Sequence, residues 1–171
     1  MIIMADIIDS SNSSYAEKYP CRLPVWWGRY GDIGPHPEGS GISGRKIVIR
    51  IEKKFKKFES IFAKILRAPK ELRRPLDKMN SLLWELCDGT RTFQEICQEL
   101  DSTYHEEIAP VVNRTTLGIA SLIANNLMLS LDEPLAGKWN IGPGITPAGQ
   151  TLDELDERLN IDISLLEDEK Y

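Results

Sequence analysis

Residues 76–96, LDKMNSLLWELCDGTRTFQEI, constrain the fold of this 171-residue chain more than any other stretch. Asp77 lies where a helix N-cap is expected, and Asp88-Gly89 is a typical end to a helix because glycine adopts the left-handed conformation easily. Between them, apolar residues recur at the spacing of one helix face, at Met79, Leu82, Leu83 and Leu86. The stretch therefore predicts two helices joined by a sharp turn.

The second of these helices is predicted to begin at Thr92. Thr92 and Glu95 have the form of a capping box, in which each side chain hydrogen-bonds to the backbone amide of the other residue. The apolar spacing continues at Phe93, Ile96, Cys97 and Leu100. Cys97 is therefore expected in the core, whereas the pattern leaves the environment of Cys87 open.

A third helix is predicted to begin at Thr103. Thr103 and Glu106 match the capping box again, and the helix is expected to continue to about Asn126. Pro110 is expected in its first turns or at a kink, because proline lacks the amide hydrogen that a helix interior needs. Residues 127–131, LMLSL, then have the composition of a strand.

Upstream of these helices the pattern is typical of strands. Residues 21–30, CRLPVWWGRY, predict a short strand with Trp26 or Trp27 packed on the core. Residues 45–51 place three isoleucines on one face of another strand. Three helices with short strands predict an α+β fold, namely a winged helix-turn-helix with a three-helix core and a small antiparallel β-sheet.

Residues 53–67 predict a basic amphipathic helix. Four lysines lie beside an apolar stripe made of Phe55, Phe58, Phe62, Ile65 and Leu66. In one interpretation this helix packs on its own domain, with the lysine amines extended into solvent. In the other, it docks on a partner or on an anionic membrane, which would make the protein a membrane-surface protein.

Residues 39–44, GSGISG, match the dinucleotide-binding fingerprint G-x-G-x-x-G. That fingerprint binds phosphate only where it follows a strand and opens a helix. Here a stretch rich in glycine and proline precedes it, and the strand-like residues 45–51 follow. The match therefore indicates a linker, and no cofactor is expected.

The charges of the chain are unevenly distributed. Residues 45–74 contain twelve Lys or Arg against three Glu, whereas residues 151–171 contain eight acidic residues against Arg158 and Lys170. Such separation predicts a basic docking surface, an acidic tail, or contact between the two. The acidic tail either folds back on the basic surface or remains solvated, and within it Thr151 to Glu154 predicts the cap of a short helix with Leu152, Leu155 and Leu159 on one side.

The three cysteines show no paired spacing, and the sequence has neither a signal-peptide pattern nor a long apolar run. These features predict a cytoplasmic protein with reduced thiols. The two histidines, His36 and His105, have no neighbouring residues arranged as a catalytic triad or a metal site. We therefore expect no enzymatic activity and no metal.

The predicted third helix is poorly suited to reading DNA. A recognition helix needs basic or amide side chains on an exposed face, yet Arg114 is the only strong base here, and Glu106 and Glu107 lie in the first turn. Nucleic acid is therefore not the expected partner. A winged-helix DNA-binding regulator, which would use the basic segment on phosphates, is the alternative function.

The core segment resembles the PqqD-like family. The resemblance covers residues 72–131 and is carried by Leu76-Asp77, by the run WELCDG at residues 84–89, by Arg91-Thr92 and Glu95-Ile96, and by residues 122–128. This family includes the peptide-binding chaperone of pyrroloquinoline quinone biosynthesis and the recognition elements of enzymes that modify ribosomal peptides. The resemblance implies a non-catalytic adaptor that presents a precursor's leader peptide to a partner enzyme, commonly a radical SAM maturase.

In that family the leader peptide adds as a strand to the small sheet, in the groove beside the third helix. By position, the docking strand here is expected at residues 71–76, where Pro75 removes one amide donor. The resemblance then implies that the peptide-binding residues are Leu72, Arg73, Arg74, Leu76, Asn113, Arg114 and Leu117. The expected organisation is a mobile N-terminal arm (1–20), a PqqD-like winged-helix domain with its preceding strands and basic helix (21–135), and an acidic C-terminal extension (136–171).

Overall fold

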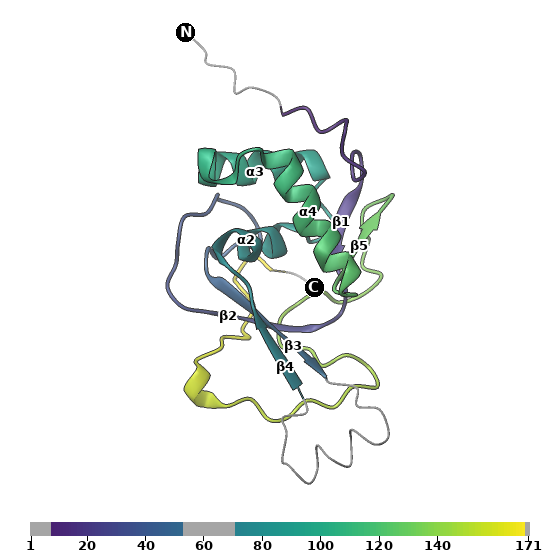
Figure 1. The fold of residues 1–171 in the computed structure, drawn as a ribbon. Coiled ribbons are helices and arrows are strands. Elements are labelled where there is room, and N and C mark those ends of the chain that lie inside the picture. Colours follow the sequence, from purple (N-terminus) through teal and green to yellow (C-terminus); the bar gives the residue numbers. More distant parts are fainter. Residues whose placement is uncertain (1–7, 53–70, 170–171) are drawn as a thin grey trace.

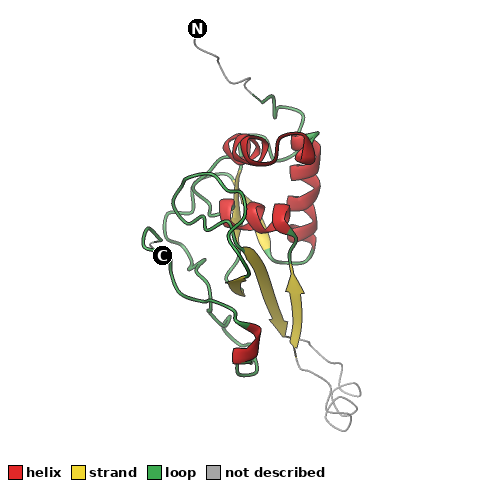
Figure 2. Ribbon diagram, turned by 90° about the vertical axis from the view of Figure 1, so that its left-hand side faces the viewer, coloured by secondary structure: helices red, strands yellow, loops and turns green. Residues whose placement is uncertain are grey.

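The computed structural model describes residues 8–52 and 71–169 of the chain, which form an α+β fold. Among the described residues, four strands precede the α-helices and a fifth follows them. The elements in chain order are β1 (Tyr19–Arg22), β2 (Trp26–Tyr30), β3 (Lys46–Glu52), β4 (Glu71–Pro75), α2 (Lys78–Leu86), α3 (Phe93–Tyr104), the 3₁₀ helix η1 (His105–Ile108), α4 (Val111–Ala124), β5 (Met128–Leu131) and the 3₁₀ helix η2 (Glu157–Leu159). The α-helices lie together at one end of the molecule, and β2, β3 and β4 extend away from them (Figure 1 and, from the side, Figure 2).

The first two helices begin and end as predicted. The Asp77 carboxylate accepts a hydrogen bond from the amide of Asn80, and Gly89 follows α2 with a positive φ of 79°. Thr92 and Glu95 form the expected capping box at the start of α3. Cys97 is fully buried, and so is Cys87, whose environment the sequence left open.

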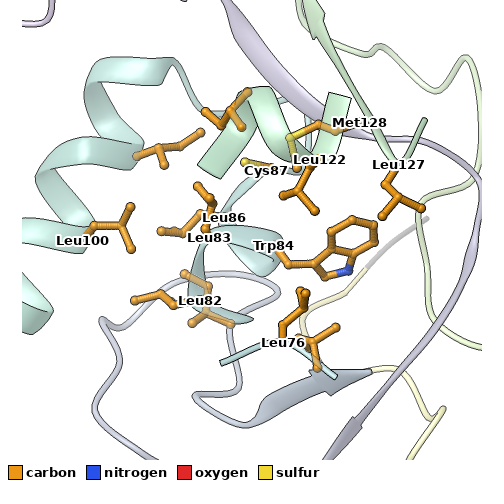
Figure 3. Close-up of a cluster of buried hydrophobic side chains, with 14 of the residues drawn as sticks. Leu76, Leu82, Leu83, Trp84, Leu86, Cys87, Leu100, Leu122, Leu127 and Met128 are labelled. Carbon is orange, nitrogen blue, oxygen red and sulfur yellow. The ribbon is translucent and has the colours of Figure 1, made fainter. Parts of the chain in front are cut away.

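The apolar faces of the helices meet in the main core. Leucines of α2 lie there with Leu100 of α3, Leu122 of α4 and Trp84 (Figure 3). Cys87, Leu127 just before β5 and Met128 at its start belong to the same cluster. The core continues onto the sheet through Trp27, Ile47 and Ile49.

The prediction of a continuous third helix from Thr103 is wrong. α3 extends to Tyr104, η1 follows, and α4 begins only at Val111, after the N-cap residue Pro110. The Thr103 hydroxyl donates to the carbonyl of Glu99 instead of capping a new helix. The reason is local, because the residue before a proline is restricted to extended backbone, and Ala109 has a ψ of 140°. His105 and the two glutamates after it therefore lie in η1 and not in the first turn of α4.

The strands form two antiparallel sheets. The larger one has the order β2-β3-β4, and the smaller one pairs β1 with β5. The strand predicted at residues 127–131 is thus confirmed, and the one predicted at 21–30 proves to be parts of two strands, β1 and β2. Both tryptophans of β2 are buried: Trp27 in the main core, and Trp26 on the opposite face, where the Arg50 guanidinium lies 4.4 Å from its ring centre.

The predictions for the segments outside the helical core differ in how well they agree with the structure. Residues 8–18 of the expected arm lie against the helices, where Ser13 hydrogen-bonds to Thr116 on α4 at 2.7 Å and the ring of Tyr15 packs on Phe93. The helix predicted at 53–67 lies outside the described residues. The helix predicted to begin at Thr151 is not formed; the short η2 begins after Asp156, whose carboxylate caps it. Within the described ranges, no helix has both the length and the apolar character needed to cross a membrane.

Candidate functional site

β4 is an outer strand of the three-stranded sheet. The amide of Leu76 donates to the carbonyl of Ile47 on β3 at 2.8 Å, and backbone groups alternate in direction along an antiparallel strand. The backbone groups of Leu72 and Arg74 therefore point toward β3, and those of Glu71, Arg73 and Pro75 point away from it. The hydrogen bonds of the described residues include none to the outward backbone groups of Glu71 and Arg73. Because Pro75 faces outward, its missing amide hydrogen costs the β3–β4 ladder nothing.

The opposite edge of the sheet, at β2, is covered by the chain itself. Arg29 and Asp162 exchange both backbone hydrogen bonds, at 2.9 and 2.6 Å, and the amide of Gly144 donates to the carbonyl of Trp27 at 2.8 Å. The C-terminal segment fits closely, because a Cβ atom on Gly28 would lie 2.4 Å from Ile161 Cγ2. Covering an edge in this way is a common protection against unwanted pairing.

A groove of about 300 Å³ lies between the end of β4, the first turns of α2 and the middle of α4. Four of the seven predicted site residues line it: Arg74, Leu76, Arg114 and Leu117. Leu76 is buried in its floor, whereas Leu117 is 70% exposed on α4. The groove thus combines an apolar floor with two guanidinium groups.

The other three predicted residues are not in the groove. Leu72 is half exposed further along β4, on the same face as Arg74. Arg73 pairs in register with Arg50, so its side chain projects from the opposite face of the sheet. There the hydrogen bonds from Arg158 lower the pKa of Asp156, and the charge of Arg73 adds a smaller effect in the same direction. Asn113 is exposed on α4 outside the groove lining.

Sequence reasoning missed several groove residues. These are Asp77, Met79, Asn80, Ile108, Gly118, Ser121 and Leu122. Met79 and Asp77 were recognised only as parts of a helix, and their place beside the groove depends on how α2 packs on α4. Gly118 permits that packing, because a Cβ atom there would lie 2.9 Å from Leu83 Cδ2.

A buried cluster of charged side chains joins β2, α2 and the C-terminal segment. The Glu85 carboxylate accepts hydrogen bonds from Arg29 Nε at 2.9 Å and from the amide and hydroxyl of Ser43 at 2.9 and 2.8 Å. Glu169 lies 2.7 Å from Arg29 Nη1. Burial by itself lowers the pKa of the Arg29 guanidinium, but the carboxylates of Glu169 and Glu85 outweigh it and raise that pKa above its ordinary value. No feature of the sequence pattern identified this cluster.

The tail also covers part of the basic segment. Arg45 forms an ion pair with Asp162 at 3.0 Å, and Arg50 Nη2 donates to the carbonyl of Asp153 at 2.5 Å as well as to Glu71. Hydrogen bonds from Ser164, more than the charge of Arg45, lower the pKa of the Asp162 carboxyl. The acidic tail thus folds back on Arg45 and Arg50: it pairs the charge of Arg45 with Asp162, whereas the charge of Arg50 is paired with Glu71 of β4.

The side chains with potential chemical reactivity, the three cysteine thiols and His36, are held by burial or by a hydrogen bond. Burial raises the pKa of the Cys21 and Cys97 thiols to about 11 and that of Cys87 well above its ordinary value. His36 hydrogen-bonds to the carbonyl of Gly34. The part of the chain that the structure describes contains no group of three or more His, Cys, Asp or Glu side chains that could hold a metal ion. The groove beside β4 is our candidate functional site, because it lies next to the sheet edge that no described residue covers and contains four of the seven predicted residues.

Comparison of the chain with protein-family models, with curated proteins and with solved structures finds no match.

Proposed function

We propose that the protein is a non-catalytic, cytoplasmic adaptor that binds an extended peptide by strand addition at β4 and presents it to a modifying enzyme. In this proposal β2–β4 and α2–α4 form a winged helix-turn-helix of the PqqD-like type, and the peptide is the leader of a ribosomally made precursor. The partner is a maturase, commonly of the radical SAM class in proteins that this chain resembles.

The observation that carries the proposal is the difference between the two edges of the sheet. The edge at β2 is paired with residues 144 and 162, whereas the outward groups of β4 have no partner among the described residues. An incoming strand gains backbone hydrogen bonds from Arg73 and Glu71 and places alternate side chains on each face. The groove lies on one of these faces.

The groove also indicates what the peptide contains. Its floor is formed by apolar side chains such as Leu76, Ile108 and Leu122, which favour an apolar anchor. Arg74 and Arg114 favour an acidic residue near that anchor. Because a partly exposed ion pair contributes about 1 kcal/mol or less, the backbone bonds and the anchor determine most of the affinity.

A tethered peptide explains how a protein without a catalytic site assists a reaction. Binding the leader holds the rest of the precursor near the partner enzyme and raises its effective concentration there. The adaptor needs only a site for the peptide and a surface for the enzyme.

The test uses a phage-displayed library of random short peptides selected on the wild-type protein. A selected peptide is then titrated by calorimetry into wild type, Arg73→Pro and Arg73→Ala. The amide of Arg73 points away from β3, so proline removes an edge donor without breaking the β3–β4 ladder. We expect Arg73→Pro to abolish binding, and Arg73→Ala, the matched control, to weaken it about fivefold or less.

Circular dichroism checks that both variants keep the helical core. The same affinity in Arg73→Pro and wild type, with an intact core, would sink the strand-addition model.

A further inference from the structure

The outward edge of β4 has the features of a self-complementary surface. Its residues Glu71, Leu72 and Arg73 combine an acid whose side chain is 13% exposed, a half-exposed apolar side chain and an exposed base. Two-fold symmetry pairs the same surface of both subunits, so such a sequence can satisfy itself across a dimer axis.

The register of self-pairing follows from the direction of the backbone groups. Only outward residues exchange hydrogen bonds across a new antiparallel pair, so Glu71 and Arg73 pair with each other or with their own copies. Pairing Arg73 with Arg73, Glu71 with Glu71 or Arg74 with Arg74 opposes like charges, which is destabilising. The register that places Glu71 opposite Arg73 opposes unlike charges twice.

That register also brings the two copies of Leu72 directly together at the dimer axis. Leu72 is 52% exposed, and a non-hydrogen-bonded antiparallel pair has the closest approach of side chains across two strands. Pro75, which has no amide to donate, lies beyond the residues that this register needs.

The Glu71 carboxylate is able to accept a second cation. Both hydrogen bonds from Arg50, from Nε at 3.0 Å and from Nη2 at 2.5 Å, end on Oε2. A carboxylate accepts on both oxygens, and no hydrogen bond from a described residue ends on Oε1, which can therefore accept from Arg73 of the second copy.

We propose that two copies of the chain pair antiparallel through β4, with Glu71 opposite Arg73 and Leu72 opposite Leu72, and form a six-stranded sheet. The two grooves then lie on the same face of the joint sheet. The edge that a peptide needs is occupied in this dimer, so self-pairing competes with peptide binding; this last consequence rests on the proposed function.

The test is a charge exchange followed by analytical ultracentrifugation over a wide range of concentration. Wild type is expected to change from monomer to dimer as concentration rises. Arg73→Glu and Glu71→Lys are each expected to remain monomeric, because each homodimer opposes like charges twice. An equimolar mixture of the two variants is expected to form heterodimers, since both cross-strand pairs are then of opposite charge. Leu72→Asp, which places two acids at the axis, provides a further monomeric variant, and circular dichroism confirms that every variant is folded.

Each other outcome overturns the proposal. A wild type that is monomeric throughout excludes the dimer, variants that all dimerise place the interface elsewhere, and a mixture that remains monomeric excludes the register. The peptide selected for the function test distinguishes the two proposals. If wild type dimerises but no peptide dissociates it, the dimer stands and the peptide-binding function fails; if wild type is monomeric and the peptide binds, the reverse holds.

Discussion

Replacing Glu85 by glutamine tests the buried cluster around Arg29. The carboxylate accepts three hydrogen bonds on Oε2 and one from the amide of Gly44 on Oε1 at 3.3 Å. A glutamine oxygen can keep the first three, but its amide group then points a donor at the donor of Gly44. The substitution also removes one of the two negative charges beside Arg29, while Glu169 remains.

The expected loss follows from these contacts. Breaking a buried pair costs about 3–5 kcal/mol, and we expect the lower end, about 3 kcal/mol, because Glu169 still neutralises Arg29. That is a large fraction of the roughly 5–15 kcal/mol by which domains are stable. Urea unfolding followed by tryptophan fluorescence measures it. Glu107→Gln is the matched control, since its pair with Lys78 is exposed and its loss costs less than about 1 kcal/mol. A loss below about 1 kcal/mol in Glu85→Gln, at an unchanged denaturant slope, would refute the reasoning.

Three further predictions concern packing, capping and pH. Gly28→Ala should lower the free energy of unfolding by about 1–3 kcal/mol, because the added methyl overlaps Ile161, and it should speed proteolysis of the C-terminal segment. Gly34→Ala is the control: the nearest atom to its added methyl is 3.5 Å away, so neither quantity should change. Thr92→Ala should cost about 1 kcal/mol in urea unfolding by removing the cap of α3, and an unchanged midpoint would contradict that role. The free energy of unfolding should fall as pH rises from about 9 to 11, because the thiols of Cys21, Cys87 and Cys97 ionise in the unfolded chain before they do in the folded one. Cys97→Ala should make that decline shallower without abolishing it, and an equal slope in both proteins would exclude a contribution of the Cys97 thiol.

The features that were predicted correctly depend on neighbours in the sequence. The N-cap at Asp77, the capping box at Thr92 and the apolar faces of α2 and α3 are set by residues within one or two helical turns of each other. The strand at β4 and four groove residues followed from a resemblance to a family in which these positions share a groove. Local rules failed at Thr103, where two signals competed and Pro110 decided the start of α4.

The features that were missed depend on contacts between distant residues. Arg29, Glu85 and Glu169 come from three separate parts of the chain, and a charged residue in a strand or helix gives no sign of its partner. Arg73 is a mixed case, because alternation along β4 correctly places its side chain on the face opposite to Leu72 and Arg74. Its alternation was visible in the sequence, but which face carried the groove depended on the packing of α2 and α4.

The covering of β2 by residue 162 has a consequence for synthesis of the protein. Domains begin to fold while the ribosome is still extending the chain. β2, β3 and the helices are synthesised well before residues 162 and 169, and can therefore fold before these residues are available. During that interval Arg29 has one of its two carboxylates, and the edge of β2 is as open as that of β4. A nascent chain with two exposed sheet edges is most prone to pair with its neighbours on the same messenger RNA. Residues 162 and 169, which are translated after the helices, thus end this period of vulnerability.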